Sequence, residues 1–349
     1  MVKEQNFPGE TWEQKDPGEL GFSAEKLNEF GSWVSEIGMG KTYQFAVSRN
    51  GYLVAEWRLG VAADKPQRQA SAAKSFYSCV LGIAADEGKI PSPDARVADY
   101  YPDMMDVGKD EGPKAERYAF EKDRDITFRQ LICNVSGYMK PGEEPGKVFH
   151  YQTYGMNIFT HALAAVYELY DTKDPDRLPG FGQLLDEKIW SRIGGTWGYT
   201  TSNFDLQPNA KLNVFGHYTQ VHATAYDLLR IGHLWLNWGN WNGTQVVPEA
   251  FLKEATVTNR FILENEPEEN WKYGHGFWVN DHGKQWQDLP KDSFAASGAG
   301  AKHTWVCPRL GLVVVQNPGL WDQFKSGEEN KKVATQNETI ARVLDAIKE

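Results

Sequence analysis

Two neighbouring runs near the N-terminus alternate apolar and polar residues, at positions 43–48 and 52–57. Both runs are rich in residues that favour strands, and Asn50-Gly51 lies between them. An Asn-Gly pair suits the left-handed conformation of a tight hairpin turn, so the pattern predicts an antiparallel pair of strands. An amphipathic helix is predicted just before this hairpin, at about residues 23–34.

A helical pattern follows the hairpin and begins at Ser71, a residue type that caps helices. The apolar residues after it recur at steps of three, four and seven, which places them on one face. They are Ala73, Phe76, Tyr77, Val80, Leu81 and Ala84. Gly88 is a typical helix stop, and Pro91 lies just beyond it. We therefore predict a buried helix with Ser71 as its N-cap.

The remaining pattern separates a helical part of the chain from parts that form strands. Residues 86–200 are poor in strand signals, and helices are predicted at 128–133, 158–169 and 184–193. Strand patterns return at 274–279, 302–306 and 312–316, after a helix that opens with a capping box at Thr224. A last helix carries apolar residues on one face, at Val333, Ile340, Val343, Leu344 and Ile347.

Strands near both ends of the chain, with a helical insertion between them, favour an α+β fold. We expect an antiparallel sheet that is built from N-terminal and C-terminal segments and is flanked by helices. Residues 1–85 and 200–349 would form this sheet domain, and residues 86–199 would form a mostly helical domain. The active site would lie at the interface of the two domains.

Size and charge narrow the class of protein. The chain has 349 residues, and 41% of them are hydrophobic, which is enough for one large or two medium domains with a substantial core. The net charge of −10 argues against nucleic acid or an anionic membrane surface as the main partner. No apolar run approaches the roughly 18 residues that are required to cross a bilayer.

Cysteine usage and the first residues bear on metal sites and on the cellular compartment. Cys79, Cys133 and Cys307 are scattered in apolar surroundings and are expected to be buried thiols. No spacing typical of a zinc site occurs, so no metal or other cofactor is expected. Residues 1–6 are not followed by the apolar segment of a signal peptide. The sequence as written therefore indicates a cytoplasmic protein, and prior removal of such a segment would instead indicate a periplasmic or secreted one.

Ser71 and Lys74 are three residues apart, so their side chains rise from one side of the first helical turn. A serine hydroxyl becomes a strong nucleophile only when a base takes its proton. A lysine is such a base in its uncharged form, which burial favours. The alternative is a capped core helix whose lysine reaches solvent. The same spacing occurs at Ser23 and Lys26, but that helix is polar, so we expect Lys26 to be solvated and Lys74 to be half buried.

Further motifs follow Ser71-Ala72-Ala73-Lys74 in a defined order. They occupy residues 86–90, residues 126–132 running into 135–137, residues 145–151 and residues 273–278. With the Asn50-Gly51 hairpin before them, they make the chain from about Phe22 onward resemble the serine β-lactamase and penicillin-binding-protein superfamily. It is similar to the branch that holds class C β-lactamases, family VIII carboxylesterases and hydrolases of 6-aminohexanoate oligomers.

The resemblance implies a β-lactamase/transpeptidase-like fold and an acyl-enzyme mechanism. Ser71 would be the nucleophile that accepts the acyl group, and Lys74 would be its proton partner. Tyr151-Gln152-Thr153 matches a motif that is usually Tyr-x-Asn, and Tyr151 would relay a proton to the leaving group. The alternative for Tyr151 is an ordinary core tyrosine. Thr153 replaces the amide that would bind a substrate acylamino chain, which disfavours efficient β-lactam turnover.

The third motif of the superfamily is usually Lys/His-Thr/Ser-Gly on an inner strand. Its best match is Ala296-Ser297-Gly298, which lacks the basic residue that would anchor a substrate carboxylate. The resemblance implies that Ser297 and Gly298 line the substrate site and that the N–H groups of Ser71 and Ala299 form the oxyanion hole. A simple glycine turn before a strand is the alternative, and the register here is open by a residue or two.

Other side chains lie close to these motifs in the sequence. Lys302 and His303 are candidates for restoring a positive charge near the site, and His150 is a candidate for orienting Tyr151. Both histidines are alternatively ordinary polar residues. Three aromatic residues are candidates for lining an acyl pocket, although large aromatic residues are core by default. They are Tyr138, Trp305 and Trp321.

The leading hypothesis is a serine hydrolase without a metal, which cleaves ester or amide bonds of small substrates through an acyl-enzyme. One alternative is a β-lactamase or a D-alanyl carboxypeptidase or aminopeptidase. Another is a non-catalytic relative that keeps the fold for binding. The presence of Ser71, Lys74 and Tyr151 together argues against the non-catalytic relative.

Overall fold

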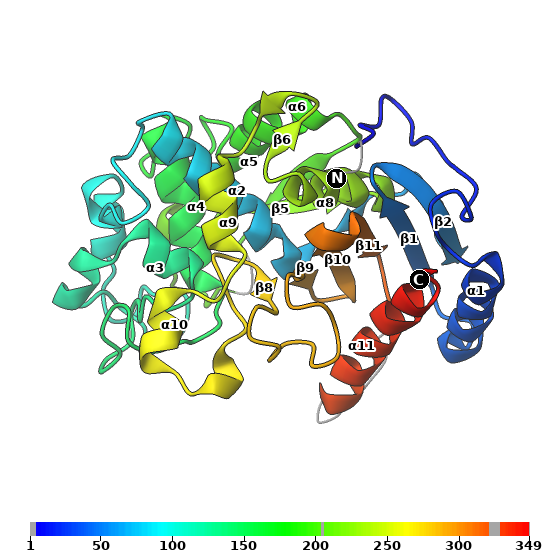
Figure 1. The fold of residues 1–349 in the computed structure, drawn as a ribbon. Helices are drawn as coiled ribbons and strands as arrows, with labels where there is room; N and C mark the ends of the chain where they lie inside the picture. The colour runs from blue at the N-terminus through cyan, green and yellow to red at the C-terminus, as the bar shows by residue number, and fades with distance from the viewer. Residues whose placement is uncertain (1–4, 204–205, 321–328, 349) are drawn as a thin grey trace.

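A six-stranded antiparallel sheet forms the centre of the structure, a computed structural model that describes residues 5–203, 206–320 and 329–348 (Figure 1). The strand order is β2-β1-β11-β10-β9-β8. The strands are β1 (Tyr43–Arg49), β2 (Tyr52–Leu59), β8 (Trp278–Val279), β9 (Phe294–Gly298), β10 (Lys302–Cys307) and β11 (Leu312–Gln316). Segments from the two ends of the chain meet where Val47 of β1 lies opposite Val314 of β11. The predicted α+β fold, with a sheet made by both ends of the chain, is confirmed.

Different helices cover the two faces of this sheet (Figure 1). Helices α1 (Ala24–Gly38) and α11 (Glu329–Asp345) cover one face, where Phe45 and Val47 pack in the same core cluster as Phe30. Helix α8 (Ala225–Leu236) packs on the other face, against β1, β10 and β11, and Ala46 belongs to the core on that side. Successive residues of a strand point to opposite faces, so a strand between two helical layers is buried along its whole length.

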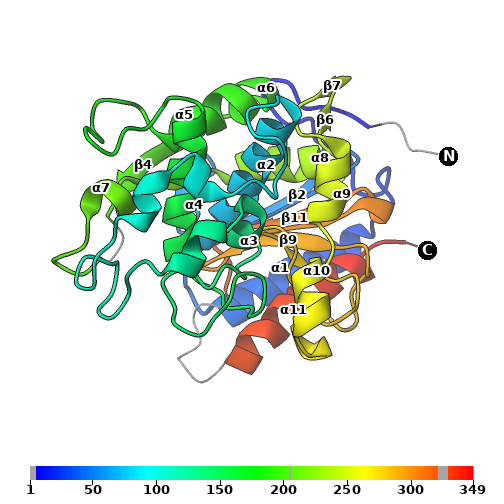
Figure 2. The same ribbon diagram turned by 90° about the vertical axis from the view of Figure 1, so that its left-hand side faces the viewer.

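Most of the remaining helices gather on the α8 side of the sheet (Figure 2). The α-helices not yet named are α2 (Ala73–Asp86), α3 (Phe128–Ile132), α4 (Tyr154–Val166), α5 (Phe181–Leu185), α6 (Ser191–Ile193), α7 (Leu212–Phe215), α9 (Glu249–Ala255) and α10 (Arg260–Asn265). Helix α2 is buried from Ala73 to Ala84 because α3, α4, α5, α9 and strand β9 all pack around it. The division into domains at residues 85/86 and 199/200 stays a prediction.

A small three-stranded sheet, which the sequence pattern does not predict, leads the chain into α2. Its order is β3-β5-β4, with β3 (Gln67–Arg68), β5 (Tyr218–Ala223) and β4 (Gly198–Ser202). A separate ribbon pairs β6 (Asn240–Trp241) with β7 (Thr244–Gln245). Strand β3 is too short to show an alternating pattern, since a period of two needs several residues to be visible.

The predicted helix at Ser71 exists, but Ser71 is not its N-cap. A 3₁₀ turn, Ala70–Ala72, comes first, and Ala72 caps α2 without a side-chain hydrogen bond. The predicted stop is confirmed, because Gly88 follows the helix with a φ of +68°. The predicted capping box at Thr224, which opens α8, is confirmed as well. Ser23 caps α1, where it accepts a hydrogen bond from the N–H of Lys26.

Several predicted boundaries are wrong. The strand expected at 274–279 is reduced to Trp278–Val279, because Gly276 has a φ of +78° and the chain there forms a loop. The helix expected at 184–193 is interrupted by a π-helical turn, Asp186–Trp190. Helix α11 ends at Asp345, so Ile347 lies beyond it and forms a bridge to Phe22. The side chain of Val333 lies outside the described residues.

The three cysteines are buried thiols, as predicted. Cys79, Cys133 and Cys307 are all fully buried, and none forms a disulfide. Burial raises the pKa of the Cys79 and Cys307 thiols to about 12. Neither thiol is therefore expected to react near neutral pH. Within the described ranges, no helix is long and apolar enough to cross a bilayer.

Four buried histidines predict a loss of stability in mild acid. Burial lowers the pKa of His161 and His233 to about 4, and that of His275 and His303 to about 3. In the unfolded chain these rings take up a proton near pH 6.5. Stability is therefore full above about pH 6.5 and falls as the pH drops toward 4, by about 2 kcal/mol per ring at pH 5.

We expect the variant His161→Gln to lose less unfolding free energy than the wild type between about pH 7.5 and about pH 5. Urea denaturation of both proteins at the two pH values measures this difference. The loss is measured within each protein between the two pH values. Any pH-independent effect of the substitution on the unfolding free energy therefore cancels. Equal losses in the two proteins would contradict the prediction.

Candidate active site

Ser71 lies where strand β3 turns into helix α2. The N–H of Gln69 donates to the carbonyl of Val221 at 2.8 Å, which extends the pairing of β3 with β5 up to the turn. Ala70 then adopts a φ of +48°, a conformation that is rare for a residue with a side chain. This sharp change of direction places Ser71, which is half-buried, in the 3₁₀ turn that leads into α2.

A buried amide pair supports this turn from behind. Gln69 Nε2 donates to Asn317 Oδ1 at 3.0 Å, and Asn317 Nδ2 donates to the carbonyl of Ala223 at 2.9 Å. Gln69 and Asn317 are both fully buried. The pair connects β3, the end of β11 and β5, so it fixes the strand before Ser71 to both sheets. The sequence gives no signal for this link, because burial of an amide is decided by distant segments.

Lys74 follows one turn later and is enclosed by the helices around α2. Its side chain is 1% exposed, so the expectation that it is half buried is wrong. The amine lies 2.9 Å from Ser71 Oγ and 3.1 Å from Tyr151 OH. Lys26, the lysine of the other Ser-x-x-Lys spacing, is solvated as predicted. Its side chain is 44% exposed, and its amine pairs with Asp345 at 2.9 Å.

Tyr151 comes from the loop that joins α3 to α4, 77 residues away from Lys74. Asn134, whose φ is +58°, holds this loop on both sides of the tyrosine. Its carbonyl accepts from the N–H of His150 at 2.9 Å, and its Oδ1 accepts from the N–H of Gln152 at 3.0 Å. Asn134 is therefore a positioning residue that the sequence reasoning did not identify.

The motif at residues 273–278 supplies walls for the Tyr151 ring. The ring of Trp278 stacks on it with centroids 5.6 Å apart, and the ring of Tyr273 meets it edge-on at 5.8 Å. Asn134 Nδ2 donates to Tyr273 OH at 3.1 Å, which ties this wall to the loop. Packing on two sides fixes the direction in which the Tyr151 hydroxyl points.

Gly298, at the end of β9, lies against the backbone of Ser71. A Cβ at this position would lie 2.3 Å from the carbonyl oxygen of Gln69 and 3.1 Å from the nitrogen of Ser71. Only glycine permits so close an approach. Strand β9 pairs with β10 so that Ser297 lies opposite His303, and Ser297 Oγ is 3.3 Å from His303 Nδ1. Ala299 follows the strand and is exposed.

The remaining predicted polar residues make contacts of other kinds. His150 Nδ1 lies 3.4 Å from Glu143 Oε1, and the Lys302 amine donates to the carbonyl of Gly300 at 2.9 Å. Burial lowers the pKa of His303 to about 3, so its ring is neutral near pH 7. The expectation that His303 restores a positive charge at the site is therefore wrong.

The aromatic residues proposed for an acyl pocket belong to the core where they are described. Tyr138 is 1% exposed and donates to the carbonyl of Met104 at 2.5 Å. Trp305 is fully buried and belongs to the core cluster on the α1 and α11 face of the sheet. Trp321 lies outside the described residues.

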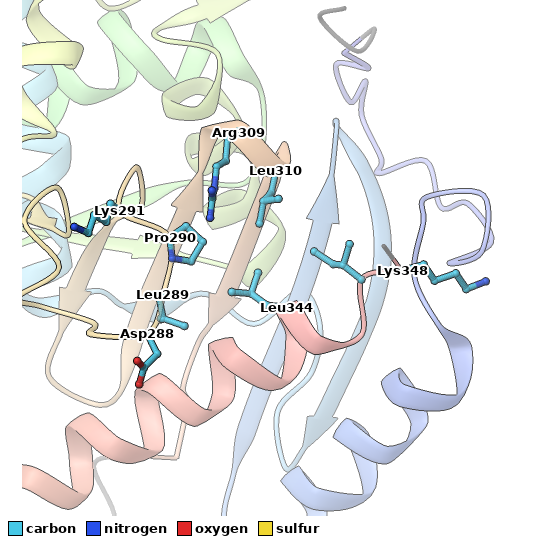
Figure 3. A pocket seen from close by; sticks show the side chains of 9 residues that line it. Asp288, Leu289, Pro290, Lys291, Arg309, Leu310, Leu344 and Lys348 are labelled. Carbon is cyan, nitrogen blue, oxygen red and sulfur yellow. The ribbon is translucent and has the colours of Figure 1, made fainter.

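A separate hollow of about 620 Å³ lies near the C-terminal end of α11 (Figure 3). It is lined by the loop at residues 288–291, by the turn at residues 309–310 and by Leu344 and Lys348. None of its lining residues belongs to the group around Ser71. Among the side chains that the structure describes, no three of the His, Cys, Asp or Glu type gather as metal ligands.

Ser71, Lys74 and Tyr151 are thus brought together by the fold, with one amine between two hydroxyl groups. Both distances from the amine are within hydrogen-bond range, so a proton can pass between neighbouring atoms without a conformational change. Gly298 keeps the backbone of β9 close to the serine. Thr153 lies two residues beyond Tyr151 and directly precedes α4.

Comparisons with known proteins agree with the resemblance that the motifs indicated. A family model described as Beta-lactamase matches residues 38–317. A Bacillus anthracis protein provisionally named a 6-aminohexanoate-dimer hydrolase has a similar structure, with a TM-score of 0.65 and 18% identity, over 99% of this chain and 91% of that one. A family VIII carboxylesterase matches with a TM-score of 0.61 and 17% identity, over 90% and 97% of the two chains.

A penicillin-binding-protein homologue from Caulobacter crescentus is similar as well. Its TM-score is 0.63 at 16% identity, over 88% of this chain and 94% of that chain. At such identities the three structures indicate a shared fold rather than a shared substrate. The sequence-based resemblance to the superfamily is confirmed.

Proposed function

The chain belongs to the beta-lactamase family, and on that premise we propose that it is a serine hydrolase that cleaves ester or amide bonds of small substrates through an acyl-enzyme. The single observation that carries this proposal is the position of the Lys74 amine, 2.9 Å from Ser71 Oγ and 3.1 Å from Tyr151 OH. A buried amine between a serine and a tyrosine hydroxyl is the arrangement that activates a serine without histidine.

The first half of the reaction transfers the acyl group to the enzyme. Ser71 Oγ attacks the substrate carbonyl carbon while its proton passes to the uncharged Lys74 amine. The carbon–oxygen or carbon–nitrogen bond to the leaving group then breaks, and the leaving atom takes a proton from Tyr151 OH. Tyr151 regains its proton from Lys74, so the amine is again uncharged. The product is an ester of Ser71.

The second half of the reaction releases the acid. A water molecule gives a proton to the same Lys74–Tyr151 pair and attacks the ester carbonyl, and Ser71 recovers its proton as it leaves. In each half the carbonyl oxygen becomes negatively charged. The N–H groups of Ser71 and Ala299 are our proposal for the donors that stabilise this oxyanion.

Two residues favour simple esters or amides over β-lactams. Ala296 occupies the first position of the third motif, where a basic residue would anchor a substrate carboxylate. Thr153 offers a hydroxyl in place of the amide that would hold an acylamino chain. Loss of one charged contact and one amide contact removes binding energy that is specific to penicillin-type substrates.

A pre-steady-state experiment tests the proposal. We expect a p-nitrophenyl ester of a short fatty acid to give a burst of p-nitrophenol, followed by slower steady turnover, because the acyl-enzyme accumulates. A fluorophosphonate should label Ser71 in the wild type. The variant Ser71→Ala should show neither the burst nor the label, and Ser23→Ala is the matched control at the other Ser-x-x-Lys position.

The possible results separate the competing hypotheses. Turnover of nitrocefin without turnover of esters would replace the proposed substrate class with β-lactams. Failure of the fluorophosphonate and of a boronic acid to react with Ser71 would indicate a binding protein that has kept the fold.

A further inference from the structure

A cavity of about 270 Å³ lies beside Tyr151, on the side formed by the helical part of the chain. The residues that line it include Lys114, Arg117, Lys140, His150, Tyr151 and Thr153. At roughly 30 Å³ per water molecule it has room for about nine waters, which is enough for a short chain of carbon atoms with a polar end. Tyr151 lines this cavity and also accepts the hydrogen bond from Lys74, so the cavity adjoins the group formed by Ser71, Lys74 and Tyr151.

The lining of this cavity has an excess of positive charge. The carboxylate of Glu143 pairs with two of these side chains: it lies 3.2 Å from the Lys140 amine and 3.4 Å from His150 Nδ1. Arg117 instead donates to the carbonyl of Met139 at 3.4 Å, and the Lys114 amine lies 5.2 Å from the centre of the Tyr154 ring. Neither of these two cations has an ion pair among the described residues.

An excess of positive charge around one cavity is unusual in an acidic protein. The whole chain carries a net charge of −10, so three permanent cations around one small cavity are not explained by composition. Lys140 is only 4% exposed, and burial of an amine beside other cations is costly. Burial lowers the pKa of Lys140, and Arg117 and Lys122 lower it further, while Glu143 acts in the opposite direction. A bound anion would offset this cost.

We propose that the cavity is an anion subsite, and that the natural substrate carries a carboxylate which Arg117 and Lys140 hold on the far side of Tyr151. The inference rests on the proposed hydrolase function, because Tyr151 is the residue that links the cavity to the chemistry. A planar guanidinium matches a carboxylate with two parallel hydrogen bonds, and an ammonium adds a third charged contact. The subsite supplies, from the helical side, the positive charge that Ala296 does not supply in the third motif.

Two matched pairs of esters test the subsite. The first pair carries the charge on the acyl group: p-nitrophenyl hydrogen glutarate is compared with p-nitrophenyl valerate. The second carries it on the leaving group: 4-acetoxybenzoate is compared with its methyl ester. We expect the acid of one pair to have a kcat/KM about 10- to 100-fold higher than its neutral partner, as charge-assisted hydrogen bonds allow. The pair that shows the preference identifies which part of the substrate enters the cavity.

Three variants assign the preference to the cavity. Arg117→Gln and Lys140→Met should each lower the ratio of the acid to the neutral ester toward one, because each removes a charged contact. Lys147→Met is the matched control, since it removes an exposed lysine of the same loop that does not line the cavity. It should leave the ratio unchanged. If Lys140→Met fails to fold, Arg117→Gln still decides the question, because Arg117 is only half-buried.

The outcomes distinguish failure of the subsite from failure of the function. The subsite is overturned if kcat/KM for the acid does not exceed that for the neutral ester in either pair. It is also overturned if the preference for the acid persists in Arg117→Gln. Titration calorimetry with glutarate and with the neutral glutaramide needs no turnover. Tighter binding of glutarate, weakened in Arg117→Gln, supports the subsite even without ester cleavage, and equal binding overturns it. Absence of labelling at Ser71 overturns the hydrolase proposal alone.

Discussion

Replacement of Lys74 by methionine is expected to lower kcat/KM for a p-nitrophenyl ester by roughly 10²- to 10⁴-fold, the range that a positioned proton-transfer group contributes. Methionine is unbranched like lysine and only one atom shorter, but it has no amine to take the proton of Ser71 or to return one to Tyr151. Lys74 is 1% exposed among apolar helices, so the apolar replacement should not unfold the protein. Steady-state kinetics and a thermal unfolding curve of the variant measure both effects.

Lys26→Met is the control for this prediction. It makes the same substitution three residues after a serine, at a lysine that is 44% exposed and paired with Asp345. Surface ion pairs contribute only about 0–1 kcal/mol, so this variant should retain wild-type kinetics and nearly wild-type stability. Wild-type activity in a correctly folded Lys74→Met protein would show that another group activates Ser71.

Replacement of Gly298 by alanine is expected to reduce activity by about 10²-fold or more, because displacement of reacting groups by about 1 Å has effects of this size. The new Cβ would lie 2.3 Å from the carbonyl oxygen of Gln69 and 2.7 Å from the nitrogen of Ala72. Both atoms belong to the backbone of the turn that carries Ser71, so they cannot rotate away. Either β9 or the Ser71 turn has to move. Overpacking of this kind also costs about 1–3 kcal/mol of unfolding free energy.

Gly198→Ala provides the matched control. Gly198 is also a strand glycine, in β4, but a Cβ there meets its nearest neighbour, the Cβ of His222, at an ordinary 3.9 Å. This variant should keep both activity and stability. We expect fluorophosphonate labelling of Ser71 to be slower in Gly298→Ala than in Gly198→Ala. Equal labelling rates would show that the contact between Gly298 and the serine turn is not required for reactivity.

Regular elements with a clear period were predictable from the sequence. The hairpin around Asn50-Gly51, the strand Leu312–Gln316, the capping box at Thr224 and the stop at Gly88 all appear as expected, because each is encoded within a few neighbouring residues. The short strand β3 and the 3₁₀ turn before α2 were not predictable, because two or three residues carry no period. Pairing with β5, which follows about 150 residues later, creates the strand, and the 3₁₀ turn after it packs against β9 and β10.

The candidate site shows the same division. The spacing of Ser71 and Lys74 puts the two side chains on one helical turn, and this much is fixed by helix geometry alone. The order of the motifs also pointed to Tyr151 and Gly298 as members of the site. Asn134 and the pair of Gln69 and Asn317 were not identified, because a polar side chain shows its burial and its partners only after the chain has folded.

The sequence by itself thus determined the longer periodic helices and strands of this protein, the antiparallel sheet with flanking helices, and the adjacency of one hydroxyl and one amine. Tertiary structure alone decided that the amine is buried rather than half exposed, that a phenol 77 residues away reaches it, and that a glycine backbone touches the nucleophile. The physical reason is the separation along the chain of the residues that interact. Helix and strand periods depend on neighbours in the chain, whereas desolvation and contact between distant residues depend on how helices and sheets pack.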